Sequence, residues 1–169
     1  MAAERQIPGG AYVNETATAQ RQAPGSAFIN ETAAVVLQYA RPSSDIAAAG
    51  WLPSTGTDLY AMLDETVADD ADYIYSPENP ITQQFEVKLS AITDPQSSAN
   101  HTVRIRLWAF RHDTNYDLNL VQGTTVLDSW TENVTEAAGA VTREHILSGA
   151  VTDSITDYFD LRIRGIARE

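Results

Sequence analysis

The chain of 169 residues contains no cysteine, which excludes disulfide bonds, thiolate metal sites and cysteine nucleophiles together. Lysine is nearly absent as well, since Lys88 is the single one, and lysine-based covalent chemistry has only this candidate. No run of 18 apolar residues occurs, and the first ten residues, MAAERQIPGG, lack the basic-then-apolar pattern of a secretion signal. We therefore expect no membrane span and no classical export. We expect synthesis in a cytoplasm.

Charge is unevenly distributed along the chain. Residues 1–41 contain three acidic and three basic residues, whereas residues 42–169 contain 20 acidic and eight basic ones and account for the whole net charge of −12. An acidic surface repels phosphate backbones and anionic membranes. The composition therefore argues against nucleic acid and membrane as partners.

A repeat with a spacing of 16 residues marks the N-terminal segment. The stretch RQIPGGAYVNET at residues 5–16 aligns with RQAPGSAFINET at residues 21–32, with aromatic under aromatic and β-branched under β-branched residue. Each copy joins a Pro-Gly turn to an alternating segment that favours a short strand. Because this region lacks the apolar spacing of a helix, we predict an extended arm at residues 1–41 and one domain at residues 42–169.

An extended arm of this kind needs a binding partner. By itself it cannot bury enough apolar surface to offset about 1–2 kcal/mol of backbone entropy per ordered residue. Its aromatic and β-branched side chains can anchor on a partner while its backbone adds strands to a sheet edge. Two similar anchors fit two copies of one groove on a symmetric lattice or in a homo-oligomer, a trimer included. The predicted anchor residues are Pro8, Gly9, Tyr12, Val13, Asn14, Pro24, Gly25, Phe28, Ile29 and Asn30.

The domain that follows the arm carries the alternation of β-strands. Alternating or β-rich segments occupy residues 72–75, 85–91, 103–110, 118–121, 125–130 and 158–166. Gly123 lies between two of them and predicts a hairpin loop. The short segments 59–63, 142–147 and 150–156 stay open between helix and strand. The pattern favours an all-β fold, a β-sandwich of the jelly-roll type.

The repeated arm resembles the N-terminus of small virion proteins from tailed bacteriophages and related prophages. The segments VQGTTVLDSW at residues 121–130 and ITDYFDLRIR at residues 155–164 resemble the closing strands of a sandwich domain common in such proteins. The resemblance implies a structural component of a phage particle, a capsid decoration or cement protein on the capsid surface. The partner that it implies is the major capsid protein.

Signatures of catalytic and metal sites are weak in this sequence. The histidines His101, His112 and His145 lack a zinc-ligand spacing, and no Gly-x-Ser-x-Gly turn is present for a serine nucleophile. The acid-rich segment 64–72 offers oxygen ligands for calcium, but it lacks the glycine and the later glutamate of an EF-hand loop, which favours a solvated turn. We expect no enzymatic activity, no cofactor and no metal site.

The tryptophans Trp51, Trp108 and Trp130 support a second hypothesis. Exposed aromatic side chains on a jelly roll can stack against sugar rings, as in a carbohydrate-binding module or a host-receptor-binding fibre. The simpler interpretation, which we favour, places Trp108 and Trp130 in the core or in cross-strand pairs. A particle-bound protein needs a repeated docking arm and a sugar-binding one does not, so capsid decoration is the first prediction.

Overall fold

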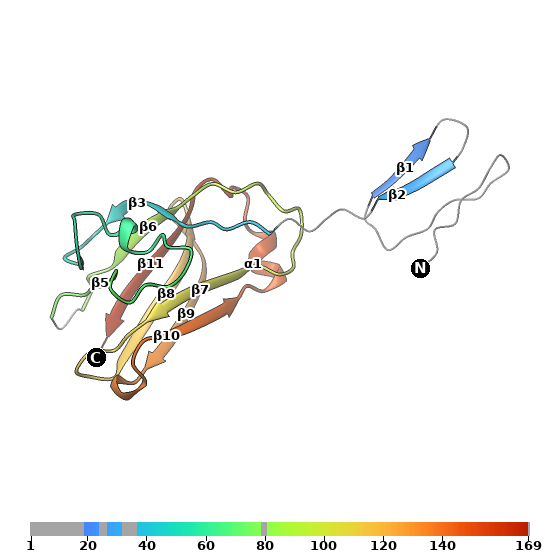
Figure 1. Cartoon of the computed structure of the whole chain (residues 1–169). Helices are drawn as coiled ribbons and strands as arrows, with labels where there is room; N and C mark the ends of the chain where they lie inside the picture. Colours follow the sequence, from blue (N-terminus) through green and yellow to red (C-terminus); the bar gives the residue numbers. More distant parts are fainter. Residues whose placement is uncertain (1–18, 24–26, 32–36, 79–80, 169) are drawn as a thin grey trace. The chain divides into compact units, whose positions relative to one another are not determined.

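The computed structural model describes residues 19–23, 27–31, 37–78 and 81–168. The chain divides into two units, residues 1–37 and 38–169. The first unit contains β1 (Ala19–Ala23) and β2 (Ala27–Glu31), which pair antiparallel as a hairpin (Figure 1).

The second unit, which we call the body, is built mainly of antiparallel strands (Figure 1). They are β3 (Pro42–Ala47), β4 (Leu52–Pro53), β5 (Ile74–Tyr75), β6 (Phe85–Leu89), β7 (Thr102–Leu107), β8 (Thr114–Gln122), β9 (Thr125–Val134), β10 (Val141–Ile146) and β11 (Leu161–Arg168). The helical elements of the described residues are the 3₁₀ turns η1 (Tyr60–Met62) and η2 (Glu136–Ala138) and the short helix α1 (Gly149–Asp153). The all-β prediction is confirmed. Among the described helices, none has the length and apolar character needed to cross a membrane.

Three nested strand pairs define the topology of the body. β8 and β9 form the innermost hairpin, β7 pairs with β10 around it, and β6 pairs with β11 around both. β11 also pairs with β8, so the order β3-β6-β11-β8-β9 makes one five-stranded sheet, and β7 and β10 make a separate ribbon. Nested antiparallel pairs rolled into two layers are a jelly-roll arrangement, here with three pairs in place of the four of an eight-stranded roll.

Two segments cover the inner face of the five-stranded sheet. The ribbon of β7 and β10 packs over β8 and β9, and residues 48–78 pack over β6. Asp45 of β3 accepts hydrogen bonds from the backbone nitrogen atoms of Leu59 (2.8 Å) and Tyr60 (2.7 Å), which holds η1 against the sheet. Asp70 in the second segment forms an ion pair with Arg106 of β7, so the two covering segments are tied to each other.

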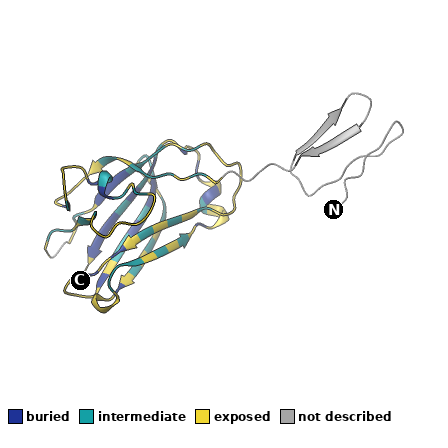
Figure 2. Cartoon of the chain, in the orientation of Figure 1, coloured by how far each residue is buried: buried dark blue, intermediate teal, exposed yellow. Residues whose placement is uncertain are grey.

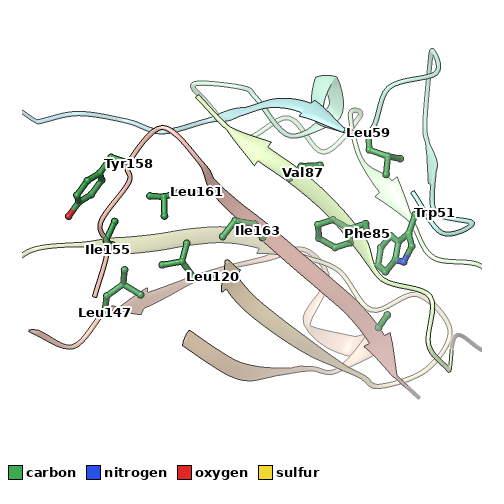
Figure 3. Close-up of a cluster of buried hydrophobic side chains, with 11 residues drawn as sticks. Trp51, Leu59, Phe85, Val87, Leu120, Leu147, Ile155, Tyr158, Leu161 and Ile163 are labelled. Atoms are coloured by element: carbon green, nitrogen blue, oxygen red, sulfur yellow. The ribbon is translucent and has the colours of Figure 1, made fainter. Parts of the chain in front are cut away.

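The largest core cluster lies between these layers, and Figure 2 shows the buried residues concentrated along the central strands. At one end, Trp51 packs edge-on against Phe85 with ring centroids 4.9 Å apart (Figure 3). At the other end, Leu147, Ile155 and Tyr158 close the cluster (Figure 3). Hydrophobic side chains from segments far apart in sequence therefore hold the sandwich together.

Several elements differ from the sequence prediction. The segment 142–147, open between helix and strand, belongs to β10, whereas 150–156 contains α1 and 59–63 contains η1. β11 begins at Leu161 and not at residue 158, because Asp160 donates its backbone hydrogen bond to the carbonyl oxygen of Asp157 in a turn. β3 escapes prediction because PSSDIA lacks an apolar alternation, and it lies at the sheet edge, where a proline is tolerated.

Candidate functional site

The second copy of the N-terminal repeat, residues 21–32, contains β2 and residues 21–23 of β1, which together form most of a β-hairpin. Ala23 at the end of β1 lies opposite Ala27 at the start of β2, so three residues, 24–26, separate the strands. Of the predicted anchors, Phe28, Ile29 and Asn30 lie on β2, opposite Gln22, Arg21 and Gln20 of β1. The predicted anchors outside the described residues are Pro8, Gly9, Tyr12, Val13, Asn14, Pro24 and Gly25.

This hairpin is a small sheet in the part of the chain that the structure describes. β1 and β2 form a two-stranded sheet, and within the described residues no third strand joins it. A lone two-stranded hairpin is at best marginally stable in water, because it lacks a layer or a further strand to bury its surfaces. In general, the unpaired backbone groups at the edge of such a sheet can hydrogen-bond to a strand of another protein.

The acid-rich segment 64–72 does not gather its carboxylates into a metal site. Asp70 is paired with Arg106, whose hydrogen bonds lower the pKa of the Asp70 carboxyl. Burial and the neighbouring aspartates raise the pKa of Glu65. In the part of the chain that the structure describes, no group of three or more histidine, aspartate or glutamate side chains could hold a metal ion.

The histidines lie in separate environments. His145 of β10 stacks face to face on Trp130 of β9, with ring centroids 4.2 Å apart, and its Nε2 atom lies 2.8 Å from a carboxylate oxygen of Asp128. The Nε2 atom of His101 lies 2.9 Å from the hydroxyl oxygen of Tyr158. His145 therefore connects β10 of one layer to β9 of the other. The histidines of the described residues do not share a common site.

A shallow polar cleft of about 240 Å³ lies beside α1. Its lining residues are Asp94, Gln96, Ser97, Ser98, Thr152, Asp153, Ile155 and Tyr158. Burial, with the charges of Asp94 and Asp153, raises the pKa of Tyr158, so its hydroxyl stays protonated beside His101. Hydroxyl and carboxylate groups of this lining can hydrogen-bond a small polar molecule.

The tryptophans occupy three different environments. Trp51 is 4% exposed and lies in the core, where its indole nitrogen donates to the carbonyl oxygen of Gln83. Trp130 is partly buried under His145. Trp108 is 48% exposed, so the interpretation of a core or cross-strand residue is wrong for Trp108 and holds for Trp130. Phe110, 68% exposed, packs edge-on against Trp108 with ring centroids 5.8 Å apart.

The outward position of this aromatic pair follows from the alternation along β7. Arg104 and Arg106 face outward on the strand, and Trp108 and Phe110 continue the same side beyond its end. Ala109 between the two rings is fully buried in the smaller core cluster. The alternation of buried and exposed residues therefore continues past Leu107, where β7 ends. Ala109 stays in the core, and the two rings on either side of it point outward.

The loop from β7 to β8, residues 108–113, is held firmly at its base. Tyr116 of β8 donates its hydroxyl hydrogen bond to the carbonyl oxygen of Trp108 over 2.6 Å, and burial raises the pKa of Tyr116 to about 12. Asp113 accepts a hydrogen bond of 3.0 Å from the backbone nitrogen of Glu136 in η2. These contacts fix both ends of the loop.

Arg111 completes this surface. Its backbone has a φ of 76°, in the left-handed region that non-glycine residues rarely adopt, and its guanidinium carbon lies 5.3 Å from the centroid of the Phe110 ring. We call Trp108, Phe110 and Arg111 the aromatic tip. Of these three residues, Trp108 was the one predicted from its residue type, although the alternation over residues 103–110 also places Phe110 on the same side.

The outer face of the five-stranded sheet, by contrast, carries polar side chains that bond to one another across the strands. Thr131 and Arg168 both donate hydrogen bonds to Asp117, which lower the pKa of its carboxyl. Cross-strand hydrogen bonds also join Ser129 to Asn119 and Asn133 to Asn115, and Glu86 pairs with Arg162 and Arg164. This face therefore carries several paired polar side chains, whereas the aromatic tip leaves its rings exposed.

No protein family, curated protein or solved structure matches the chain. Its function is therefore inferred from its own residues and their geometry.

Proposed function

We propose that the chain is a structural virion protein, a capsid decoration or cement protein that docks on a phage head and stabilises neighbouring capsid subunits. The observation that carries this proposal is the hairpin of β1 and β2, a two-stranded element that gains stability from a partner sheet. Residues 5–16 repeat the sequence pattern of residues 21–32, so one arm offers two similar docking elements.

The arm and the body have different tasks in this proposal. The neutral arm adds strands to exposed edges of the major capsid protein, and Tyr12, Val13, Phe28 and Ile29 anchor it there. Once one repeat is bound, the second binds at high effective concentration, so that the arm ties two lattice positions together. The acidic body, with a net charge of −12 over residues 42–169, keeps particles apart by repulsion. Assembly of the body into a homo-oligomer, such as a trimer, would multiply the number of bound arms.

Binding to purified heads of the encoding phage or prophage, prepared without this protein, tests the proposal. The double variant Tyr12→Ala with Phe28→Ala should lose at least about tenfold in affinity in a co-sedimentation titration, because buried aromatic anchors dominate interface energies. The melting temperature of the body should not change.

The repeat itself supplies the matched control. The exchange Tyr12→Phe with Phe28→Tyr gives each copy the aromatic residue of the other, so it should bind heads like the wild type. Full occupancy of heads by the double alanine variant would contradict anchoring by the arm. Failure of the exchanged variant to bind would contradict the equivalence of the two repeats.

A further inference from the structure

The aromatic tip lies at the end of the body opposite to the one at which the chain enters it. Pro42 at the start of β3 pairs with Leu89 at the end of β6, whereas Arg168 at the end of β11 pairs with Asn115 at the start of β8. Residues 108–113 immediately precede β8 and therefore lie at this second end (Figure 1). The chain enters β3 at Pro42, at the first of these two ends of the body.

We propose that the aromatic tip is a carbohydrate-binding site that takes a neutral hexose ring. The exposed ring of Trp108 offers a flat apolar face for the C–H face of a sugar. On the same outward side of β7, two residues before it, Arg106 is held by Asp70 with an Nη2–Oδ2 distance of 2.7 Å. Arg111 lies beyond Phe110. Sugar hydroxyls can donate hydrogen bonds to the Asp70 carboxylate and accept them from the guanidinium groups of Arg106 and Arg111. A few fixed polar groups of this kind are enough to orient a ligand.

The size of the apolar surface favours a sugar over a protein. Fully exposed aromatic side chains present about 150–250 Å² each, so the exposed fractions of 48% for Trp108 and 68% for Phe110 leave roughly 250 Å² in total. A stable protein interface buries about 800 Å² on each partner. One or two sugar rings match the smaller area.

The net charge of the protein favours a neutral ligand over an anionic one. The net charge of −12 repels nucleic acids, anionic membranes and polyanionic polysaccharides alike. A neutral sugar carries no such penalty. The loop also needs little ordering on binding, because Tyr116 and the buried Ala109 already fix it, and a preorganised site loses less conformational entropy.

Tryptophan fluorescence of the full chain provides a direct test. Trp51 is 4% exposed and Trp130 is partly buried, so ligand-induced quenching reports mainly on Trp108. The probes are maltohexaose, cellohexaose and mannohexaose, with a hexamer of galacturonic acid as the charged comparison and phosphatidylcholine vesicles as the lipid comparison. We expect saturable quenching by at least one neutral hexaose and binding of the uronate at least about tenfold weaker.

Variants assign the binding to the aromatic tip. Trp108→Ala and Phe110→Ala should each weaken binding about tenfold or more by calorimetry, because each removes a stacking ring. Trp108→Phe keeps a ring and should keep most of the affinity. Phe159→Ala is the matched control, because Phe159 is 64% exposed in the turn before β11, at the other end of the body, and its loss should leave binding unchanged.

Three results would overturn the proposal: no binding of any neutral hexaose at millimolar concentration, preference for the uronate or for vesicles, or equal losses in Phe159→Ala and Trp108→Ala. The test is independent of the docking proposal. Trp108→Ala should still bind heads, and Tyr12→Ala with Phe28→Ala should still bind the sugar, so each proposal can fail alone.

Discussion

Replacement of Gly165 by alanine tests the packing at the centre of the five-stranded sheet. Gly165 lies on β11 between Phe85 of β6 and Leu118 of β8, with which it is in register. A Cβ atom at this position would lie 2.5 Å from Cε1 of Phe85 and 3.0 Å from Cδ2 of Leu118. Phe85 is 4% exposed and packs against Trp51, so its ring cannot move aside without disturbing the core.

The expected loss of stability follows from these contacts. Overpacking of a buried position costs about 1–3 kcal/mol, and the lower entropy of alanine in the unfolded chain offsets about 0.4–1 kcal/mol. The free energy of unfolding should therefore fall by about 1–2 kcal/mol. For a body of this size, that corresponds to a decrease in the melting temperature of roughly 3–10 °C. Urea and thermal unfolding of the full chain, followed by circular dichroism, measure both quantities.

Two further variants show whether the contact with Phe85 is the cause. At Gly149 in α1 a Cβ atom would lie 3.9 Å from Ser98, an ordinary contact, so Gly149→Ala should leave the stability unchanged or raise it by up to about 1 kcal/mol. Phe85→Leu combined with Gly165→Ala should cost less than the sum of the two single changes, because the smaller side chain makes room for the new Cβ. A Gly165→Ala variant that melts at the wild-type temperature would refute this account of the sheet.

Two predictions concern pH. Burial raises the pKa of Tyr116 from 10.0 to about 12, so the contribution of Tyr116 to stability is complete below pH 10.0 and is lost as the pH rises toward about 12. Because Tyr116→Phe removes the hydrogen bond to Trp108, it should lower the free energy of unfolding by about 1 kcal/mol at neutral pH. The same variant should show a smaller fall in melting temperature at alkaline pH. An unchanged alkaline slope would assign that fall to other groups. Hydrogen bonds from Arg168 and Thr131 lower the pKa of Asp117 below its ordinary value of 3.8, so this stabilisation is present above that pH and is lost as the pH falls through the folded-state pKa. Arg168→Gln should therefore melt below the wild type near neutral pH and approach it in strong acid, whereas a constant difference would contradict the ion pair.

Local patterns predicted the features that depend on neighbouring residues. The alternation over residues 103–110 predicted β7 and put Trp108 and Phe110 on one side of the chain, because successive side chains of extended backbone point to opposite sides. Gly123, with a φ of 59°, forms the predicted turn between β8 and β9, where few other residues adopt that conformation. The all-β class followed from the repetition of such segments.

The helix-or-strand choice at β10 depended on a distant partner. Four of the six residues of VTREHI are polar, and pairing with β7 gives this segment a partner for its backbone groups. β3 likewise becomes a strand because β6 offers an edge to it. Neither signal is present within a short window, since both strands are stabilised by hydrogen bonds to segments about 40 residues away.

The candidate sites also combine features that the local sequence predicts with features that depend on distant segments. The repeat in residues 5–32 was visible by inspection, since identity between two segments needs no structure. The alternation set Trp108 and Ala109 on opposite sides of the chain, but it did not decide which side would be covered. Leu118 and Val134, from β8 and β9, bury Ala109 and thereby leave the Trp108 side in solvent. Periodicity arises from the geometry of one strand, whereas burial depends on which other strands pack against it, and only the tertiary structure decides that.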